Sequence, residues 1–137
     1  MTIKSLLIVE GNLPLSQMLC IEFEEMGYRV SVAASCAQAL ELATGKHFDL
    51  ALLDYNLPDG LGTELMAELC RMQPHLKIVL SSANPSAETA ASNQCGVAFI
   101  RKPVGASVLN LRFKTALAHT AFNEKQDAAP GDTSSRF

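Results

Sequence analysis

Five short apolar segments alternate along the chain with five segments whose apolar residues recur at helical spacing. Short apolar runs bounded by turn residues are typical of strands buried on both faces, as in a parallel sheet. The predicted strands cover residues 3–9, 28–33, 48–53, 77–81 and 97–100, and the predicted helices cover residues 14–26, 35–45, 62–73, 85–94 and 105–122. This alternation favours a doubly wound α/β fold, in which a five-stranded parallel sheet carries helices on both faces.

The length of 137 residues suits one domain with one core. After Phe122 almost all apolar residues disappear, which predicts a folded domain over residues 1–122 and a disordered tail over residues 123–137. The net charge of −3 gives no sign of a surface for nucleic acid or membranes, and no apolar run approaches the ~20 residues of a membrane span. The four widely spaced cysteines predict reduced core thiols and a cytoplasmic protein.

Polar side chains stand at the ends of four predicted strands. Glu10 and Asp54 end the first and third strands, Ser81 and Ser82 end the fourth, and Lys102 follows the fifth. Because the carboxyl ends of parallel strands meet at one edge of the sheet, we expect these side chains to converge there. The simpler interpretation of Asp54 is a solvated strand-end residue or a helix cap. The polar residues at the other strand ends favour a functional site that includes Asp54.

Two carboxylates, a hydroxyl and an ammonium suit phosphoryl transfer to a carboxylate, with Asp54 as the nucleophile. A Mg²⁺ ion held by Asp54, Glu10 and the backbone carbonyl of Asn56 would neutralise the phosphoryl oxygens. Ser82 and Lys102 would supply a hydroxyl and a cation to the same oxygens. Ser81 is the competing hydroxyl, because alternate strand residues face opposite ways.

Four segments of the chain resemble the receiver domain of two-component response regulators. They are Leu-Leu-Ile-Val-Glu at 6–10, Leu-Leu-Asp-Tyr-Asn-Leu-Pro-Asp-Gly at 52–60, Val-Leu-Ser-Ser-Ala at 79–83 and Phe-Ile-Arg-Lys-Pro at 99–103. Each segment alone is a weak signal, but four in the family's order and spacing are highly specific. The resemblance covers residues 4–122 and implies the flavodoxin-like strand order 2-1-3-4-5.

The resemblance also implies roles and partners. Asp54 corresponds to the phosphoacceptor, Ser82 to the hydroxyl residue, Lys102 to the phosphate-binding lysine, and Phe99 to the switch aromatic whose rotamer is coupled to that hydroxyl. A signalling protein is implied rather than an enzyme. Its phosphodonor would be a sensor histidine kinase or a phosphotransfer protein. A downstream protein would bind the face formed by the fourth helix, fifth strand and fifth helix, and a homodimer is left open.

The sequence departs from the family at Gly11. Family members carry a second acid there, next to the acid at position 10, and that acid typically contacts the metal. Losing it removes one negative charge and one hard oxygen ligand, so we predict weak Mg²⁺ binding. The alternative prediction is a degenerate receiver that binds other proteins without being phosphorylated. The presence of Asp54, Ser82 and Lys102 favours a working phosphoacceptor.

Overall fold

The computed structural model describes residues 3–82, 97–102, 106–111 and 113–114. Its elements are β1 (Ser5–Val9), α1 (Leu13–Glu25), β2 (Arg29–Ala33), α2 (Cys36–Gly45), β3 (Leu50–Asp54), β4 (Asn56–Leu57), β5 (Gly60–Leu61), α3 (Gly62–Met72), β6 (Lys77–Ser82) and β7 (Val97–Arg101). Residues 106–111 and 113–114 are also helical. The helix predicted over residues 85–94 and the tail predicted over residues 123–137 lie outside the described residues.

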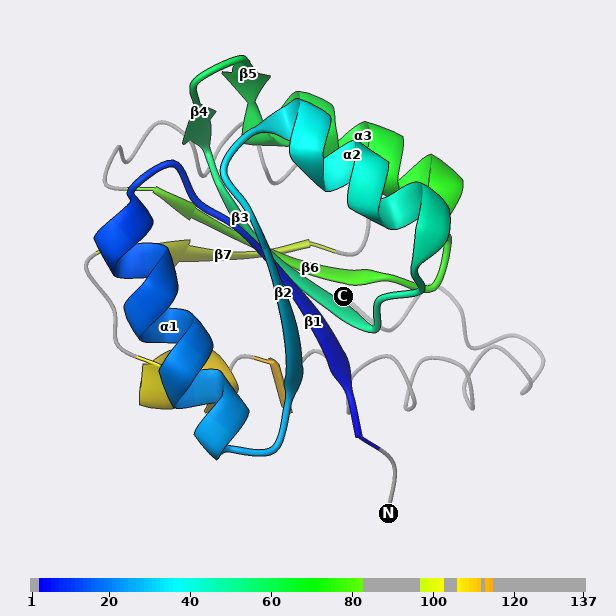
Figure 1. The fold of residues 1–137 in the computed structure, drawn as a ribbon. Coiled ribbons are helices and arrows are strands. Elements are labelled where there is room, and N and C mark those ends of the chain that lie inside the picture. The colour runs from blue at the N-terminus through cyan, green and yellow to red at the C-terminus, as the bar shows by residue number, and fades with distance from the viewer. Residues whose placement is uncertain (1–2, 83–96, 103–105, 112, 115–137) are drawn as a thin grey trace, which may run out of the picture.

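Five strands form one parallel sheet in the order β2-β1-β3-β6-β7. Since β6 and β7 are the fourth and fifth of these strands along the chain, this order confirms the predicted 2-1-3-4-5 topology. Figure 1 shows α1 and the helical residues 106–114 on one face of the sheet, and α2 and α3 on the other. The predicted doubly wound α/β fold is therefore confirmed.

The core consists of two apolar layers, one on each face of the sheet. The central strand β3 supplies both, with Ala51 and Leu53 in the layer under α2 and α3, and Leu50 and Leu52 in the layer under α1. Because alternate residues of a strand point to opposite faces, a strand buried on both faces has to be apolar throughout. Asp54 interrupts this run at the carboxyl end of β3 and is only half-buried.

Side-chain oxygens cap the starts of α1 and α2. The side chain of Asn12 accepts a hydrogen bond from the backbone N–H of Leu15 at the start of α1, and Ser35 accepts one from Gln38 at the start of α2. Such caps satisfy N–H groups that have no partner within the helix. After α1 the chain turns at Gly27, whose φ of 99° favours glycine. None of the helices among the described residues is long and apolar enough to cross a bilayer.

Two details differ from the sequence analysis. The predicted strand over residues 48–53 is followed by a small antiparallel hairpin of β4 and β5, which the sequence analysis did not predict. Cys20, Cys36 and Cys70 were expected in the core, and they are only partly buried. The hairpin strands are too short to show a periodic apolar pattern in the sequence. The three cysteines lie on helices, where positions at the edge of the apolar face are partly exposed.

Asp59 connects this hairpin to α2. Its carboxylate accepts hydrogen bonds from the backbone N–H groups of Cys36 (2.7 Å) and Ala37 (3.0 Å), which begin α2. These bonds hold the pKa of Asp59 below its usual value. Read locally, the sequence favours a turn at Asp59-Gly60. It could not show this second role, because the partners lie 22 and 23 residues away in the chain.

We expect Asp59→Ala to lower the melting temperature at pH 7, because two N–H groups of α2 lose their acceptor. A carboxyl whose pKa is lowered by folding contributes stability above its unfolded pKa, near 3.8, and loses it as the pH falls through the folded value. The difference in melting temperature between variant and wild type should therefore shrink from pH 7 to about pH 3. Thermal unfolding followed by circular dichroism measures this, and a difference that stays constant with pH would contradict it.

Candidate functional site

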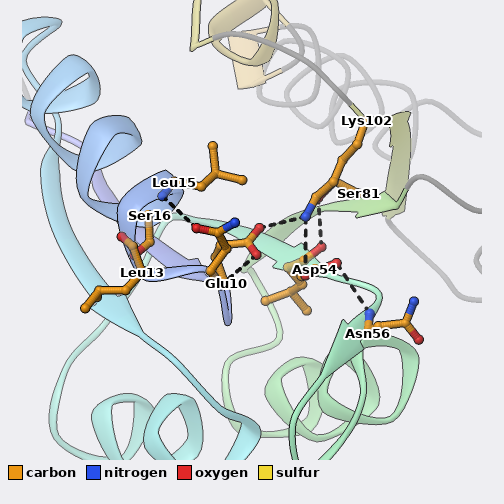
Figure 2. Close-up of polar contacts among 10 residues, drawn as sticks. Glu10, Leu13, Leu15, Ser16, Asp54, Asn56, Ser81 and Lys102 are labelled. Carbon is orange, nitrogen blue, oxygen red and sulfur yellow. Dashed lines mark hydrogen bonds and ion pairs between the residues drawn. The ribbon is translucent and has the colours of Figure 1, made fainter.

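Glu10, Asp54 and Lys102 meet at the carboxyl edge of the sheet. Figure 2 shows the Lys102 side chain reaching between the two carboxylates. Its Nζ lies 2.8 Å from Glu10 Oε1 and 3.3 Å from Asp54 Oδ2. The adjacent strands β1 and β3 bring the carboxylates together, while Lys102 comes from the end of β7, beyond β6. The convergence expected from the strand ends is thus present for these three side chains.

Glu10 is held in place from both sides. Its backbone N–H donates to the carbonyl oxygen of Ala33 (3.0 Å), and its Oε2 accepts a hydrogen bond from the backbone N–H of Asn12 (3.1 Å). Among the described residues Glu10 is the one charged residue in the buried class, with 6% of its surface exposed. A buried charge is tolerated only when it is paired. Lys102 provides that pairing, so the two residues depend on each other.

In this site two carboxylates surround one ammonium. Burial raises the pKa of Asp54, and the negative charge of Glu10 raises it further, while Lys102 lowers it. Burial lowers the pKa of Lys102, but its hydrogen bond to Glu10 and the charge of Asp54 outweigh burial and raise it overall. Lys102 therefore stays protonated, and its charge only partly offsets the rise in the pKa of Asp54.

Ser81 and Ser82 are both buried at the end of β6. Ser81 is the register partner of Asp54, and its Oγ donates to the carbonyl oxygen of Leu53 at 3.5 Å. Ser82 is paired with Arg101, and its carbonyl oxygen accepts a hydrogen bond from the backbone N–H of Lys102 (2.9 Å). The role of Ser82 stays a prediction.

Phe99 lies in β7 opposite Leu80, one step before the pair of Ser81 and Ile100. Its side chain lies outside the described residues, so its role as the switch aromatic stays a prediction.

Gly62 allows the chain to pack tightly behind Asp54. Its N–H donates to the carbonyl oxygen of Tyr55 (2.6 Å), and a Cβ at this position would lie 2.4 Å from the carbonyl oxygen of Asp54. No side chain fits at that distance without moving the backbone. Gly62 therefore fixes the backbone of the candidate nucleophile. Sequence reasoning missed this residue, since a glycine at a helix start has no distinctive local signal.

At Gly11, in contrast to Gly62, a Cβ would not clash. A Cβ there would meet Pro58 Cδ at 3.5 Å and the carbonyl oxygen of Ala34 at 3.9 Å, which are ordinary contacts. Its backbone is not in the left-handed region. Among the described residues no group of three or more His, Cys, Asp or Glu could hold a metal ion. The site accordingly offers a pair of carboxylates rather than a set of three.

Comparison with known proteins agrees with this geometry. The model of the response regulator receiver domain family matches residues 6–114. The transcriptional regulatory protein ZraR of Klebsiella oxytoca is 31% identical over 121 residues, which cover 87% of this chain and 27% of ZraR. The KDP operon transcriptional regulatory protein KdpE of Escherichia coli K12 is 32% identical over 114 residues, which cover 82% of this chain and 51% of KdpE. The chain thus spans between about a quarter and a half of the length of these relatives.

A solved structure has the same fold. The CheY-like receiver domain protein from Methanospirillum hungatei JF-1 superposes with a TM-score of 0.79 at 31% identity, covering 85% of this chain and 95% of that protein. The family match covers most of the chain, the sheet has the family's strand order, and a carboxylate ends β3. The chain belongs to the receiver domain family of two-component response regulators.

Proposed function

We propose that Asp54 is the phosphoacceptor of this receiver domain and that its phosphorylation switches contacts with other proteins. The supporting observation is the position of the Asp54 carboxylate, at the end of the central strand and 3.3 Å from the ammonium of Lys102. A carboxylate that lies beside a cation and is still partly open to solvent can act as a nucleophile.

In the proposed reaction an oxygen of Asp54 attacks the phosphorus of a phosphohistidine. The donor is a sensor histidine kinase or a phosphotransfer protein. The phosphorus–nitrogen bond breaks as the acyl phosphate forms, and the histidine nitrogen leaves with the electron pair. Lys102 then compensates the charge of the phosphoryl oxygens, as it now does for the carboxylates. The domain is a signalling module that assists its own phosphorylation.

The residues present fit a Mg²⁺ ion with incomplete protein coordination. Glu10 and Asp54 already point their oxygens at one shared cation, the ammonium of Lys102. We propose that these carboxylates and the backbone carbonyl of Asn56 hold the ion, with water in the remaining positions. When bound, the ion supplies positive charge to the phosphoryl oxygens. Because Gly11 contributes no ligand and Lys102 competes for the carboxylates, we expect weak binding.

The response to phosphorylation is proposed to run through Ser82 and Phe99 to the face that includes β7. The segment predicted as the fourth helix lies outside the described residues. We propose that the protein is cytoplasmic. We also propose that a downstream protein binds the phosphorylated domain. We place the domain at residues 1–122 and keep a homodimer open. The comparisons give no support to the alternative in which the chain acts by binding alone.

Incubation with Mg²⁺ and acetyl phosphate, or with a cognate kinase, should add the mass of one phosphoryl group to the intact protein. Asp54→Asn should abolish the adduct, because an amide is not a nucleophile at neutral pH. Asp49→Asn is a matched control, since this partly buried aspartate caps the backbone N–H of Ser5 and lies at the amino end of β3. A missing adduct, or one that persists in Asp54→Asn, would refute the proposal.

A further inference from the structure

The hairpin of β4 and β5 lies between Asp54 and α3 and carries Asn56, whose backbone carbonyl is a proposed ligand of Mg²⁺. The backbone N–H of Asn56 donates to Asp54 Oδ1 at 3.4 Å (Figure 2). Each strand of this hairpin has only two residues. A two-stranded hairpin is marginally stable by itself. The position of the Asn56 carbonyl therefore depends on the contacts that the hairpin makes with the rest of the domain.

The base of the hairpin is bonded to the sheet. The N–H of Tyr55 donates to the carbonyl oxygen of Ser81 (2.8 Å), and the N–H of Gly62 donates to the carbonyl oxygen of Tyr55 (2.6 Å). These bonds hold the two ends of the hairpin. They do not reach its tip, where Pro58 and Asp59 connect the two strands.

Asp59 attaches this tip to the start of α2. One carboxylate oxygen accepts a hydrogen bond from the N–H of Cys36 at 2.7 Å, and the other accepts one from Ala37 at 3.0 Å. The tip also packs closely against α2, since a Cβ at Gly60 would lie 3.3 Å from Cys36 Sγ. A carboxylate is favourable here because the N-terminus of a helix carries partial positive charge. The tip therefore has a specific anchor on a neighbouring helix.

The start of α2 does not depend on Asp59 alone. The helix has a side-chain cap of its own, because Ser35 Oγ accepts a hydrogen bond from the N–H of Gln38 (3.2 Å). Ala37 is exposed, so water could satisfy its N–H in the absence of Asp59. The hairpin has no comparable substitute in its own sequence, since its strands are so short. The bonds of Asp59 therefore matter more for the hairpin than for the helix.

We propose that Asp59 is a positioning residue for the metal site, because it ties the hairpin tip to α2 and so holds the carbonyl of Asn56 in place for the ion. This role depends on the proposed Mg²⁺ site and not on phosphorylation of Asp54. Both carboxylate oxygens of Asp59 are bonded to α2, so Asp59 acts through the backbone and not as a ligand. A metal ligand that is already held in place loses less conformational freedom on binding.

NMR titration of the full chain with Mg²⁺ alone tests this proposal. Asp59→Ala should weaken binding about fivefold, the effect of one net hydrogen bond. Ser35→Ala is the matched control, because it removes a cap from the same end of α2 and leaves the hairpin bonds intact. It should lower the melting temperature, as Asp59→Ala does, but leave the affinity for Mg²⁺ unchanged. Asp59→Asn keeps an acceptor for α2 and loses the charge, so it should retain most of the affinity.

The ordering of the hairpin without metal gives a second readout. Heteronuclear NOE values of the amides of residues 56, 57 and 59–61 should fall in Asp59→Ala and stay at the wild-type level in Ser35→Ala. Unchanged NOE values or unchanged Mg²⁺ affinity in Asp59→Ala would overturn the proposal. So would a wild type that does not bind Mg²⁺, or a loss of affinity in Ser35→Ala or Asp59→Asn as large as in Asp59→Ala.

These results do not depend on the phosphoryl transfer. A missing phosphoryl adduct on Asp54 would refute the proposed function and leave the Mg²⁺ titrations and the NOE values as they are. Each of the two proposals can therefore fail alone.

Discussion

Gly11→Asp should raise the affinity for Mg²⁺ at least about tenfold. The new carboxylate would stand next to Glu10 and restore a third acidic oxygen donor to the site. A unit charge about 4 Å from a cation near a protein surface is worth about 4 kcal/mol before desolvation. A net gain of about 1.4 kcal/mol is sufficient for the tenfold change. Isothermal titration calorimetry with Mg²⁺ measures the affinity.

The structure has room for a Cβ at position 11. The nearest atoms to a Cβ at position 11 are Pro58 Cδ at 3.5 Å and the carbonyl oxygen of Ala34 at 3.9 Å, so neither has to move. Gly11→Asn is the matched control, because asparagine has the same shape and lacks the charge. We expect a much smaller gain from it. Equal affinity of the aspartate variant and the wild type would show that Gly11 does not limit metal binding.

The same variant should be phosphorylated faster by acetyl phosphate at low Mg²⁺ concentration, with the difference vanishing once the ion saturates both proteins. This pattern follows if the missing acid affects binding of the ion and not the reactivity of Asp54. Mass spectrometry over a time course at several Mg²⁺ concentrations gives the rates. A rate difference that persists at saturation would assign position 11 a role in the transfer itself.

The sequence predicted the architecture because its signals are local and repeated. The apolar residues of β3 show burial on both faces, the Ser35 side chain caps the start of α2, and Gly27 follows the end of α1 with a positive φ. The strand ends predicted that Glu10 and Asp54 lie together, since β1 and β3 are parallel neighbours. The same reasoning placed Lys102 at this edge, and the strand order that puts β1 beside β3 came from the resemblance to receivers.

Features that depend on distant contacts could not be predicted. The bond from Asp59 to the start of α2 joins residues 22 and 23 positions apart, and the clash that requires Gly62 involves the carbonyl oxygen of Asp54. The pocket between α1 and Ala106 and Ser107 is likewise lined by residues about 80 positions apart in the sequence. Local periodicity identifies the apolar face of a helix but not the neighbour that leaves part of that face uncovered.

Lys102→Met should lower the free energy of unfolding by about 2 kcal/mol in the absence of Mg²⁺. The variant leaves the carboxylates of Glu10 and Asp54 facing each other without a cation. Removing one partner of a fully buried pair costs about 3–5 kcal/mol, and the 23% exposure of the Lys102 side chain reduces this. Chemical denaturation measures the difference. Lys46→Met is the matched control, because the exposed ammonium of Lys46 bonds only a serine hydroxyl among described groups, and its effect should stay within about 0.5 kcal/mol.

Mg²⁺ should restore most of the stability lost in Lys102→Met and should stabilise the wild type less. In the wild type the ion has to compete with an ammonium that already contacts both carboxylates, whereas in the variant this competitor is absent. An ion that binds only the folded state stabilises it in proportion to the logarithm of its concentration over Kd. Equal stabilisation of both proteins by Mg²⁺ would show that the ion and Lys102 do not share a position.

The deficit of Lys102→Met should also shrink as the pH falls. Burial and Glu10 already raise the pKa of Asp54, and removing the opposing charge of Lys102 raises it further. A carboxyl whose folded pKa exceeds its unfolded value destabilises the fold at high pH, and protonation relieves this as the pH falls through the folded pKa. Unfolding of the variant at pH 7 and about pH 4.5 should therefore show a smaller deficit at the lower value. A deficit independent of pH would mean that lost packing of the lysine side chain, and not charge, accounts for it.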